Sequence, residues 1–181
     1  MIPARNTHLL FALAFVGLLA GCAATSKEAV ANDPVSVKAS TTGRFGPVYS
    51  WRLAVNADRH ARLTIYAYPK ELTREFEIST NQISQLLTMA DRERFFDLRS
   101  DYGEIVPDGS TDSITITKGG SSHTVRIHFL MNWVHNDPAK LKEPARAVRV
   151  FNVVRGWFDD KDAVDARKYD NMVLEAAEKG E

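Results

Sequence analysis

Histidine is the most versatile catalytic and metal-binding side chain, and its spacing in this sequence forms no known metal motif. Four of the five histidines lie beyond residue 22: His60, His123, His128 and His135. His123 and His128 fall on one predicted strand at an odd spacing, so their side chains point to opposite faces and cannot share one metal ion. His60 falls in a predicted turn and His135 in a predicted loop. The histidines therefore predict no metal site.

Carboxylates gather in residues 101–112, a Gly-containing segment that we predict to be a loop. It holds Asp101, Glu104, Asp108 and Asp112. Their oxygens are of the type that Ca²⁺ prefers, but the order of residues does not fit an EF-hand. We therefore expect these acids to be solvated or to cap the loop. An alternative interpretation makes this segment, together with His135, the catalytic centre of an enzyme.

Nucleophilic catalysis has no better support in the sequence. The chain has no G-x-S-x-G motif and no Gly-rich phosphate-binding loop. Ser110 and Ser121 lie near His123, but no pattern supplies a group to orient the imidazole or an oxyanion site. We therefore predict no catalytic residue and expect a protein that is not an enzyme.

The single cysteine, Cys22, ends the segment Leu19-Ala20-Gly21-Cys22. This segment resembles the lipobox of bacterial lipoproteins, in which the Cys thiol receives a diacylglyceryl group and the signal is cut just before it. Arg5 and His8 precede an apolar run over residues 9–19. As a helix this run rises only about 16 Å, too short to span roughly 30 Å of bilayer hydrocarbon. Residues 1–21 are therefore predicted to be a lipoprotein signal peptide, and an ordinary signal with a chance cysteine is the alternative.

The lipobox resemblance implies both an anchor and a location. A lipidated Cys22 would hold the mature protein on a membrane, and it would be the only covalent cofactor expected. Ala23, in place of Asp, favours the outer membrane under the sorting rule known for such lipoproteins. No other cysteine remains for a disulfide, so the stability of the exported protein must come from its core. We expect a lipid-anchored protein of the cell envelope that faces the periplasm.

The chain beyond the signal divides into three parts. Residues 22–43 are rich in Ala, Ser, Thr and Lys without a sustained period, which predicts a lipidated cysteine followed by a flexible tether. Residues 44–160 are predicted to form a single α+β domain. Residues 161–181 are predicted to be a charged C-terminal tail or a loosely docked helix, because their apolar stripe is weak.

Local patterns predict the elements of this domain. Apolar side chains at every second position indicate strands within residues 51–55, 63–67, 75–78, 113–117 and 124–129. Ser79 and Gln82 fit a capping box in front of one helix, and Pro144 suits the first turn of another. Phe151 lies on the apolar face of that second helix. The order β-β-β-α-β-β-α predicts a two-layer α+β fold, an antiparallel sheet of about five strands with both helices on one face.

One face of the predicted sheet then remains free of helices and polar. Its candidate binding residues are Arg62, Tyr66, Tyr68, Arg126 and His128. Tyr and Arg often carry the energy of an interface, because they offer large contact areas and planar donors. If the two hairpins are neighbours, these residues form an aromatic and basic platform suited to a glycan or an acidic peptide. The alternative is an ordinary solvated sheet face.

Several residues of the domain make it similar to a family of uncharacterised small bacterial envelope domains. The matching residues are Phe45, Gly46, Pro47 and Tyr49, then Phe95, Phe96 and Leu98, then Asp112 before the second hairpin. The similarity covers residues 44–158. This chain is shorter between Gly46 and Pro47 and lacks the Cys often found there. The resemblance implies an architecture and no activity.

The overall composition narrows the classes of partner. The chain has 181 residues with 23 basic and 23 acidic side chains, so its formal net charge is zero. It therefore lacks the basic excess that nucleic-acid binders show, and we expect no nucleic-acid partner. We expect a non-enzymatic periplasmic binding or assembly module that meets the membrane through its lipid and contacts an envelope protein or glycan. The alternative stays an envelope enzyme that uses residues 101–112 and His135.

Overall fold

Seven strands form one mixed sheet in the computed structural model, which describes residues 33–43, 49–67, 70–107, 109–158 and 161–180. The strands are β1 (Val35–Thr42), β2 (Tyr49–Val55), β3 (His60–Ala67), β4 (Lys70–Glu77), β5 (Asp101–Tyr102), β6 (Thr111–Lys118) and β7 (Ser121–Ile127). Their spatial order is β4-β3-β2-β1-β6-β7-β5. All neighbours are antiparallel except β5 and β7, which pair in parallel.

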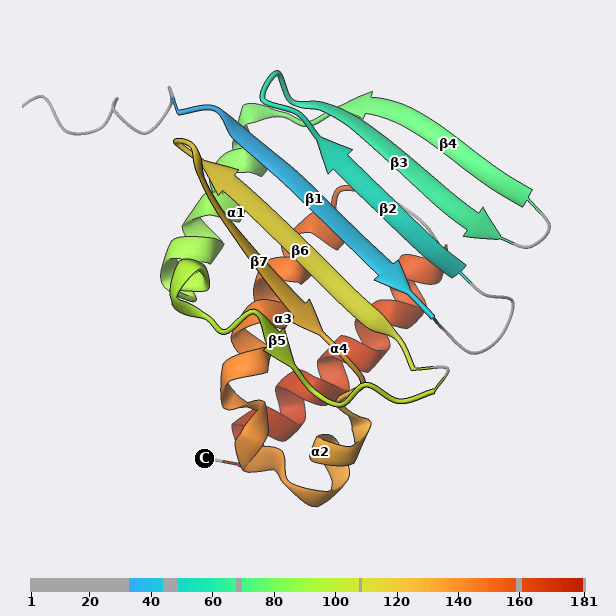
Figure 1. Ribbon diagram of the computed structural model, residues 1–181, viewed down its shortest axis with the longest axis vertical. Helices are drawn as coiled ribbons and strands as arrows, with labels where there is room; N and C mark the ends of the chain where they lie inside the picture. The colour runs from blue at the N-terminus through green and yellow to red at the C-terminus, as the bar shows by residue number, and fades with distance from the viewer. Residues whose placement is uncertain (1–32, 44–48, 68–69, 108, 159–160, 181) are drawn as a thin grey trace, which may run out of the picture. The chain divides into compact units, whose positions relative to one another are not determined.

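The helices cover one face of this sheet. They are α1 (Thr80–Arg92), α2 (Met131–Asn136), α3 (Lys142–Arg155) and α4 (Lys161–Lys179), with short 3₁₀ turns η1 (Phe95–Asp97) and η2 (Pro138–Leu141). Figure 1 shows α1, α3 and α4 behind the sheet, while the face toward the viewer carries no helix. The expected α+β class and the placement of α1 and α3 on one face are therefore confirmed. The sheet differs from the predicted antiparallel sheet of about five strands: it has seven strands, and the parallel pairing of β5 with β7, which are joined through β6 rather than by a hairpin, makes it mixed.

Strand β1 lies at the centre of the sheet and corrects the predicted tether. Val35, Val37 and Ala39 are buried and alternate with polar residues, the pattern of a strand with one covered face. The strand pairs with β2 on one side and with β6 on the other. Its inward side chains are small or β-branched and weakly apolar, so the sequence signal is faint, and the prediction that residues 22–43 form only a tether is wrong from Val35 onward.

Helices α1 and α3 form where the sequence indicates. Ser79 caps α1 as predicted: its hydroxyl accepts a hydrogen bond from the Gln82 backbone N–H, and the Gln82 side chain accepts one from the Ser79 backbone N–H. In α3, Phe151 is buried and its ring centroid lies 5.6 Å from that of Trp51 on β2. These contacts join the helical layer to the sheet in one core.

Helix α4 resolves the two alternatives for the C-terminal segment in favour of a docked helix. Val173 and Ala177 are buried in the core, and Asp170 is buried beside α3. The predicted end of the domain at residue 160 is therefore too early, because α4 supplies part of the hydrophobic interior. The predicted loop over residues 101–112 likewise contains β5 at its start, and His135 lies in α2 rather than in a loop.

Candidate functional site

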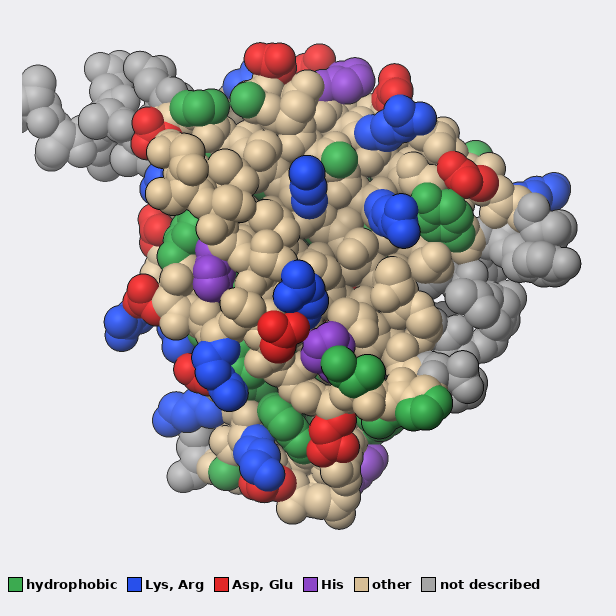
Figure 2. Space-filling view, in the orientation of Figure 1, with side chains coloured by type: hydrophobic (Ala, Val, Ile, Leu, Met, Phe, Trp, Pro, Cys, Tyr) green, Lys and Arg blue, Asp and Glu red, His purple; other side chains and the backbone are tan. Residues whose placement is uncertain are grey.

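The helix-free face of the sheet carries the residues that the sequence singled out. Figure 2 views this face, with lysine and arginine side chains over its central strands. Arg62 and Tyr66 on β3 project on this side, opposite the buried Leu63 and Ile65. Arg126 also projects here from β7. The predicted alternation of these strands is confirmed, whereas Tyr68 lies outside the described residues.

The two predicted hairpins are not neighbours, so the expected platform does not form. Strands β2, β1 and β6 lie between β3 and β7. With neighbouring strands about 4.8 Å apart, the backbones of β3 and β7 are about 19 Å apart. Tyr66 and Arg126 are therefore too far apart to contact the same small chemical group of a ligand. Strand order depends on pairings between distant segments. Here β1 lies between the hairpin of β2 and β3 and the hairpin of β6 and β7.

The three intervening strands bring two further cations to this face. Lys38 on β1 and Ala54 on β2 are paired in the register, and Ala54 is paired in turn with Arg62 on β3. The small Ala54 side chain thus leaves a gap between two long cationic ones. Arg52 projects on the same face two positions before Ala54. We call Lys38, Arg52 and Arg62, with the depression that they surround, the cationic hollow.

The cationic hollow is shallow and lined with small polar groups. Its volume is about 280 Å³. Besides the three cations and Ala54, its lining includes Ser40, Thr64, Ser113 and Thr115. In the register Ser40 pairs with Arg52 on one side and with Ser113 on the other, so hydroxyls continue from the hollow onto β6. The site combines positive charge with hydroxyl groups.

The three cations of the hollow have no carboxylate partner among the described residues. No Asp or Glu oxygen that the structure describes lies within 4.0 Å of the charged nitrogens of Lys38, Arg52 or Arg62. The nearest acid in register is Glu75 on β4, whose Oε2 lies 3.7 Å from His60 Nε2 instead. The Arg52 guanidinium lies 5.6 Å from the centre of the Tyr66 ring, a cation–π contact.

Charge is distributed unevenly over this face. Of the five central strands, β3, β2, β1 and β7 direct Arg62, Arg52, Lys38 and Arg126 outward, β6 directs hydroxyls outward, and no carboxylate among the described residues of these strands points to that side. The acids of the face lie at its two edges, on β4 and on β5. The chain as a whole is neutral, so this band of positive charge is a property of the fold and not of the composition.

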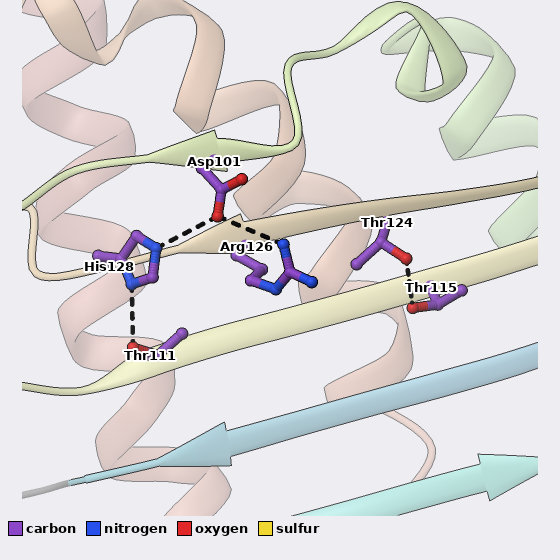
Figure 3. Close-up of polar contacts among 6 residues, drawn as sticks. All are labelled: Asp101, Thr111, Thr115, Thr124, Arg126 and His128. Carbon is purple, nitrogen blue, oxygen red and sulfur yellow. Dashed lines mark hydrogen bonds and ion pairs between the residues drawn. The ribbon is translucent and has the colours of Figure 1, made fainter. Parts of the chain in front are cut away.

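Arg126 differs from the other cations because it belongs to a polar cluster at the β5 edge, drawn in Figure 3. Asp101 Oδ1 lies 3.5 Å from Arg126 Nη1 and 3.4 Å from His128 Nε2. The other ring nitrogen of His128, Nδ1, lies 3.1 Å from Thr111 Oγ1. The cluster therefore joins the edge strand β5 to the end of β7 and the start of β6, and Asp101 offsets part of the Arg126 charge.

The order of hydroxyl, imidazole and carboxylate in this cluster is also that of a nucleophilic triad. The Asp101–His128 distance of 3.4 Å is longer than the roughly 2.6–3.2 Å expected between a catalytic base and its orienting group. Asp101 is half exposed and divided between two partners. This geometry supports a role in holding the sheet edge.

The predicted acidic segment does not gather into one site. Glu104 accepts hydrogen bonds from Asn132 Nδ2 and Trp133 Nε1 of α2, away from Asp101. Asp112 points to the opposite side of the sheet, where it is buried. His135 is exposed on α2, and Asp108 lies outside the described residues. Within the described ranges no group of three or more His, Cys, Asp or Glu side chains is arranged to hold a metal ion.

A buried charged cluster is the feature that the sequence analysis missed. Arg155 on α3 is fully buried, where Nη2 donates to Asp112 Oδ2 at 2.8 Å and Nη1 contacts Asp170 Oδ2 of α4. Asp112 also accepts a hydrogen bond from the Thr41 hydroxyl of β1. The signal for it was present, because Arg155 follows Phe151 by four residues and so lies on the apolar face of the helix.

The histidines separate as their parity predicts. His123 points to the helical side, where its ring centroid lies 5.4 Å from that of Phe95, while His128 lies on the helix-free side. Next to Asp101, Tyr102 also turns inward, and burial raises the pKa of its phenol above the ordinary value. The two histidines therefore share no site.

Comparison with known proteins identifies no family and no function for this chain. No protein-family model matches the chain, and no curated protein matches it. None of the described helices combines the length and the hydropathy needed to cross a bilayer.

Proposed function

We propose that this protein is a lipid-anchored envelope protein whose domain is a non-enzymatic binding module, with the helix-free face of the sheet as its binding surface. The observation that carries the proposal is the band of positive charge that runs across the central strands of this face, with Arg62, Arg52, Lys38 and Arg126 as its cations. A solvated face normally carries both signs of charge interspersed, whereas the described residues of the central strands direct cations outward and the acids of this face, such as Glu71 and Glu75 on β4, lie at its edges. Separation of charge within a neutral chain supports a complementary, anionic partner.

The proposed anchor agrees with the position of the domain in the chain. Cys22 carries the lipid in this proposal, and strand β1 begins at Val35. Residues 23–34 span at most about 42 Å even when fully extended. Such a short connection would keep the binding surface close to the membrane, on the periplasmic side of the outer membrane, where envelope glycans and proteins are concentrated.

The alternative of an envelope enzyme has less support. Its residues would be those of segment 101–112 and His135, but Asp112 is engaged by Arg155 in the interior and Glu104 by α2. A binding or assembly role requires only the exposed surface, so we favour it.

Photo-crosslinking in intact cells tests the proposed surface. A photoreactive amino acid at Ser113, at the centre of the helix-free face, should capture a specific envelope component that mass spectrometry identifies. The matched control is the same amino acid at Asp91, which is exposed on α1 on the helical side. Capture of the same component from both positions, or from neither, would refute the surface; a captured protein would favour assembly, and a captured glycan would favour ligand binding.

A further inference from the structure

We propose that the cationic hollow is a binding site for the phosphate group of a phosphorylated saccharide, with Lys38, Arg52 and Arg62 as its charged ligands. This inference rests on the proposed function, because it names the class of ligand that the helix-free face would take. The proposed site is the gap over Ala54 on that face.

The arrangement of the three cations is the first argument. Lys38 and Arg62 are both register partners of Ala54, so their Cα atoms are about 10 Å apart, two strand spacings, with a methyl group between them. Arg52 lies two residues from Ala54 on the same strand and closes a triangle. Lys and Arg side chains are long enough to reach a group bound over Ala54, and Arg52 would do so by exchanging its contact with the Tyr66 ring for the bound anion.

This geometry fits a tetrahedral anion better than a planar one. A phosphate monoester carries between one and two negative charges at neutral pH and offers three acceptor oxygens. Those oxygens point in different directions, so cations on three separate strands can each meet one of them. A carboxylate has two oxygens in one plane and is met most strongly by a single Arg fork.

The lack of an internal counter-ion is the second argument. Arg126 on the same face has Asp101 at 3.5 Å, whereas the three cations of the hollow have no described carboxylate within 4.0 Å. Three like charges within about 10 Å repel one another and are stabilised by an anion placed between them. The site therefore gains more from a bound phosphate than an internally paired cluster would.

The surroundings of the hollow indicate a saccharide as the carrier of the phosphate. Ser40, Thr64 and Ser113 place hydroxyls around the cations, and these match the hydroxyls of a sugar ring. The described large hydrophobic side chains that are exposed are Leu72, Ile105 and Met172, and none of them lies on the outward face of the central strands. A lipid tail or an apolar peptide anchor has no counterpart there. The volume of about 280 Å³ suits one small group.

Calorimetric titration of the purified full-length protein tests the site. Glucose 6-phosphate should bind at least tenfold more tightly than glucose. Ala54→Phe, which fills the hollow and keeps all three charges, and Arg62→Gln should each weaken the binding of glucose 6-phosphate tenfold or more. The matched control is Arg74→Gln, which removes an exposed charge from the opposite face of β4 and should leave the affinity unchanged.

Each contrary result has a distinct meaning. Equal affinity for glucose and glucose 6-phosphate, or equal weakening by Arg74→Gln, would overturn the site in favour of unspecific attraction. Flotation of the unlipidated Cys22→Ser chain with phosphatidylglycerol vesicles, lost in Ala54→Phe, would overturn the saccharide in favour of a lipid headgroup. If glucose 6-phosphate fails to bind while Ser113 still captures a partner in cells, this inference falls and the proposed function stands.

Discussion

Arg155 is the residue whose environment departs furthest from its usual one. Its guanidinium is fully buried between Asp112 of β6 and Asp170 of α4, and it lies 4.3 Å from the centre of the Phe151 ring. Through Asp112 the cluster also reaches Thr41 of β1. One interaction network therefore links two helices to two central strands. Both buried carboxylates depend on the same guanidinium, because a charge in the interior is stable only when it is paired.

Replacing Arg155 by Met should therefore destabilise the domain strongly. Two buried carboxylates would lose their cation, which costs about 3–5 kcal/mol of unfolding free energy. Urea denaturation followed by circular dichroism measures the loss. Adding Asp112→Asn and Asp170→Asn to the variant should recover part of it, because no buried charge is then left unpaired. The control Arg74→Met, at an exposed position, should change stability by less than about 0.5 kcal/mol. A loss below about 1 kcal/mol for Arg155→Met would show that the cluster does not hold α4.

At the scale of elements, strand β1 decides the architecture. It pairs with β2 and with β6, so it joins the half of the sheet built from β2, β3 and β4 to the half built from β6, β7 and β5. It also supplies Lys38 and Ser40 to the cationic hollow. Without β1, β2 and β6 would each expose an unpaired edge, and the core would lose the buried side chains Val35, Val37 and Ala39.

A truncation at the predicted domain boundary should therefore not fold. A chain of residues 44–181 lacks β1 and should show no cooperative unfolding transition in urea, whereas the matched chain of residues 33–181 should unfold cooperatively. The 33–181 chain should also be indifferent to reductant, because it contains no cysteine. Equal cooperativity in both chains would mean that β1 is dispensable for the fold.

At the scale of the whole molecule, the proposed lipid anchor would determine where the proposed binding surface operates. The sequence Leu19-Ala20-Gly21-Cys22 lies outside the described residues, so the anchor remains a prediction from the resemblance to the lipobox. Its physical consequence would be large: each buried methylene of an acyl chain contributes about 0.8 kcal/mol, so several chains would make the attachment to the membrane effectively permanent.

Cys22→Ser should accordingly move the protein out of the membrane fraction or leave its signal uncut. Because serine lacks the thiol that accepts the diacylglyceryl group, the attachment has no chemical site. Fractionation of cells and mass spectrometry of the N-terminus measure the result, with Ser26→Ala as the matched control that should remain lipidated. A cleaved Cys22→Ser protein that still sediments with membranes would contradict the anchor.

Patterns confined to neighbouring residues could be predicted from the sequence. Alternation assigns Arg62 and Leu63 to opposite faces, and the capping box at Ser79 and the apolar stripe through Phe151 locate two helices. These features are local because a strand repeats every two residues and a helix every 3.6. The separation of His123 from His128 follows from the same rule. The α+β class and the single helical layer follow in turn from the order of the elements.

The sequence by itself thus determined which side chains share a face, while the tertiary structure decided which of them meet. Tyr66 and Arg126 lie on the predicted face but four strands apart, and Lys38 takes a place beside Arg62 because β1 pairs with β2. Asp112, at the end of the acidic segment, points into the interior, where it pairs with Arg155. Strand order and ion pairing join segments that are distant in the chain. Their free energies depend on which strand edges and which charged partners are available in the folded protein, and the periodicity of neighbouring residues contains no information about either.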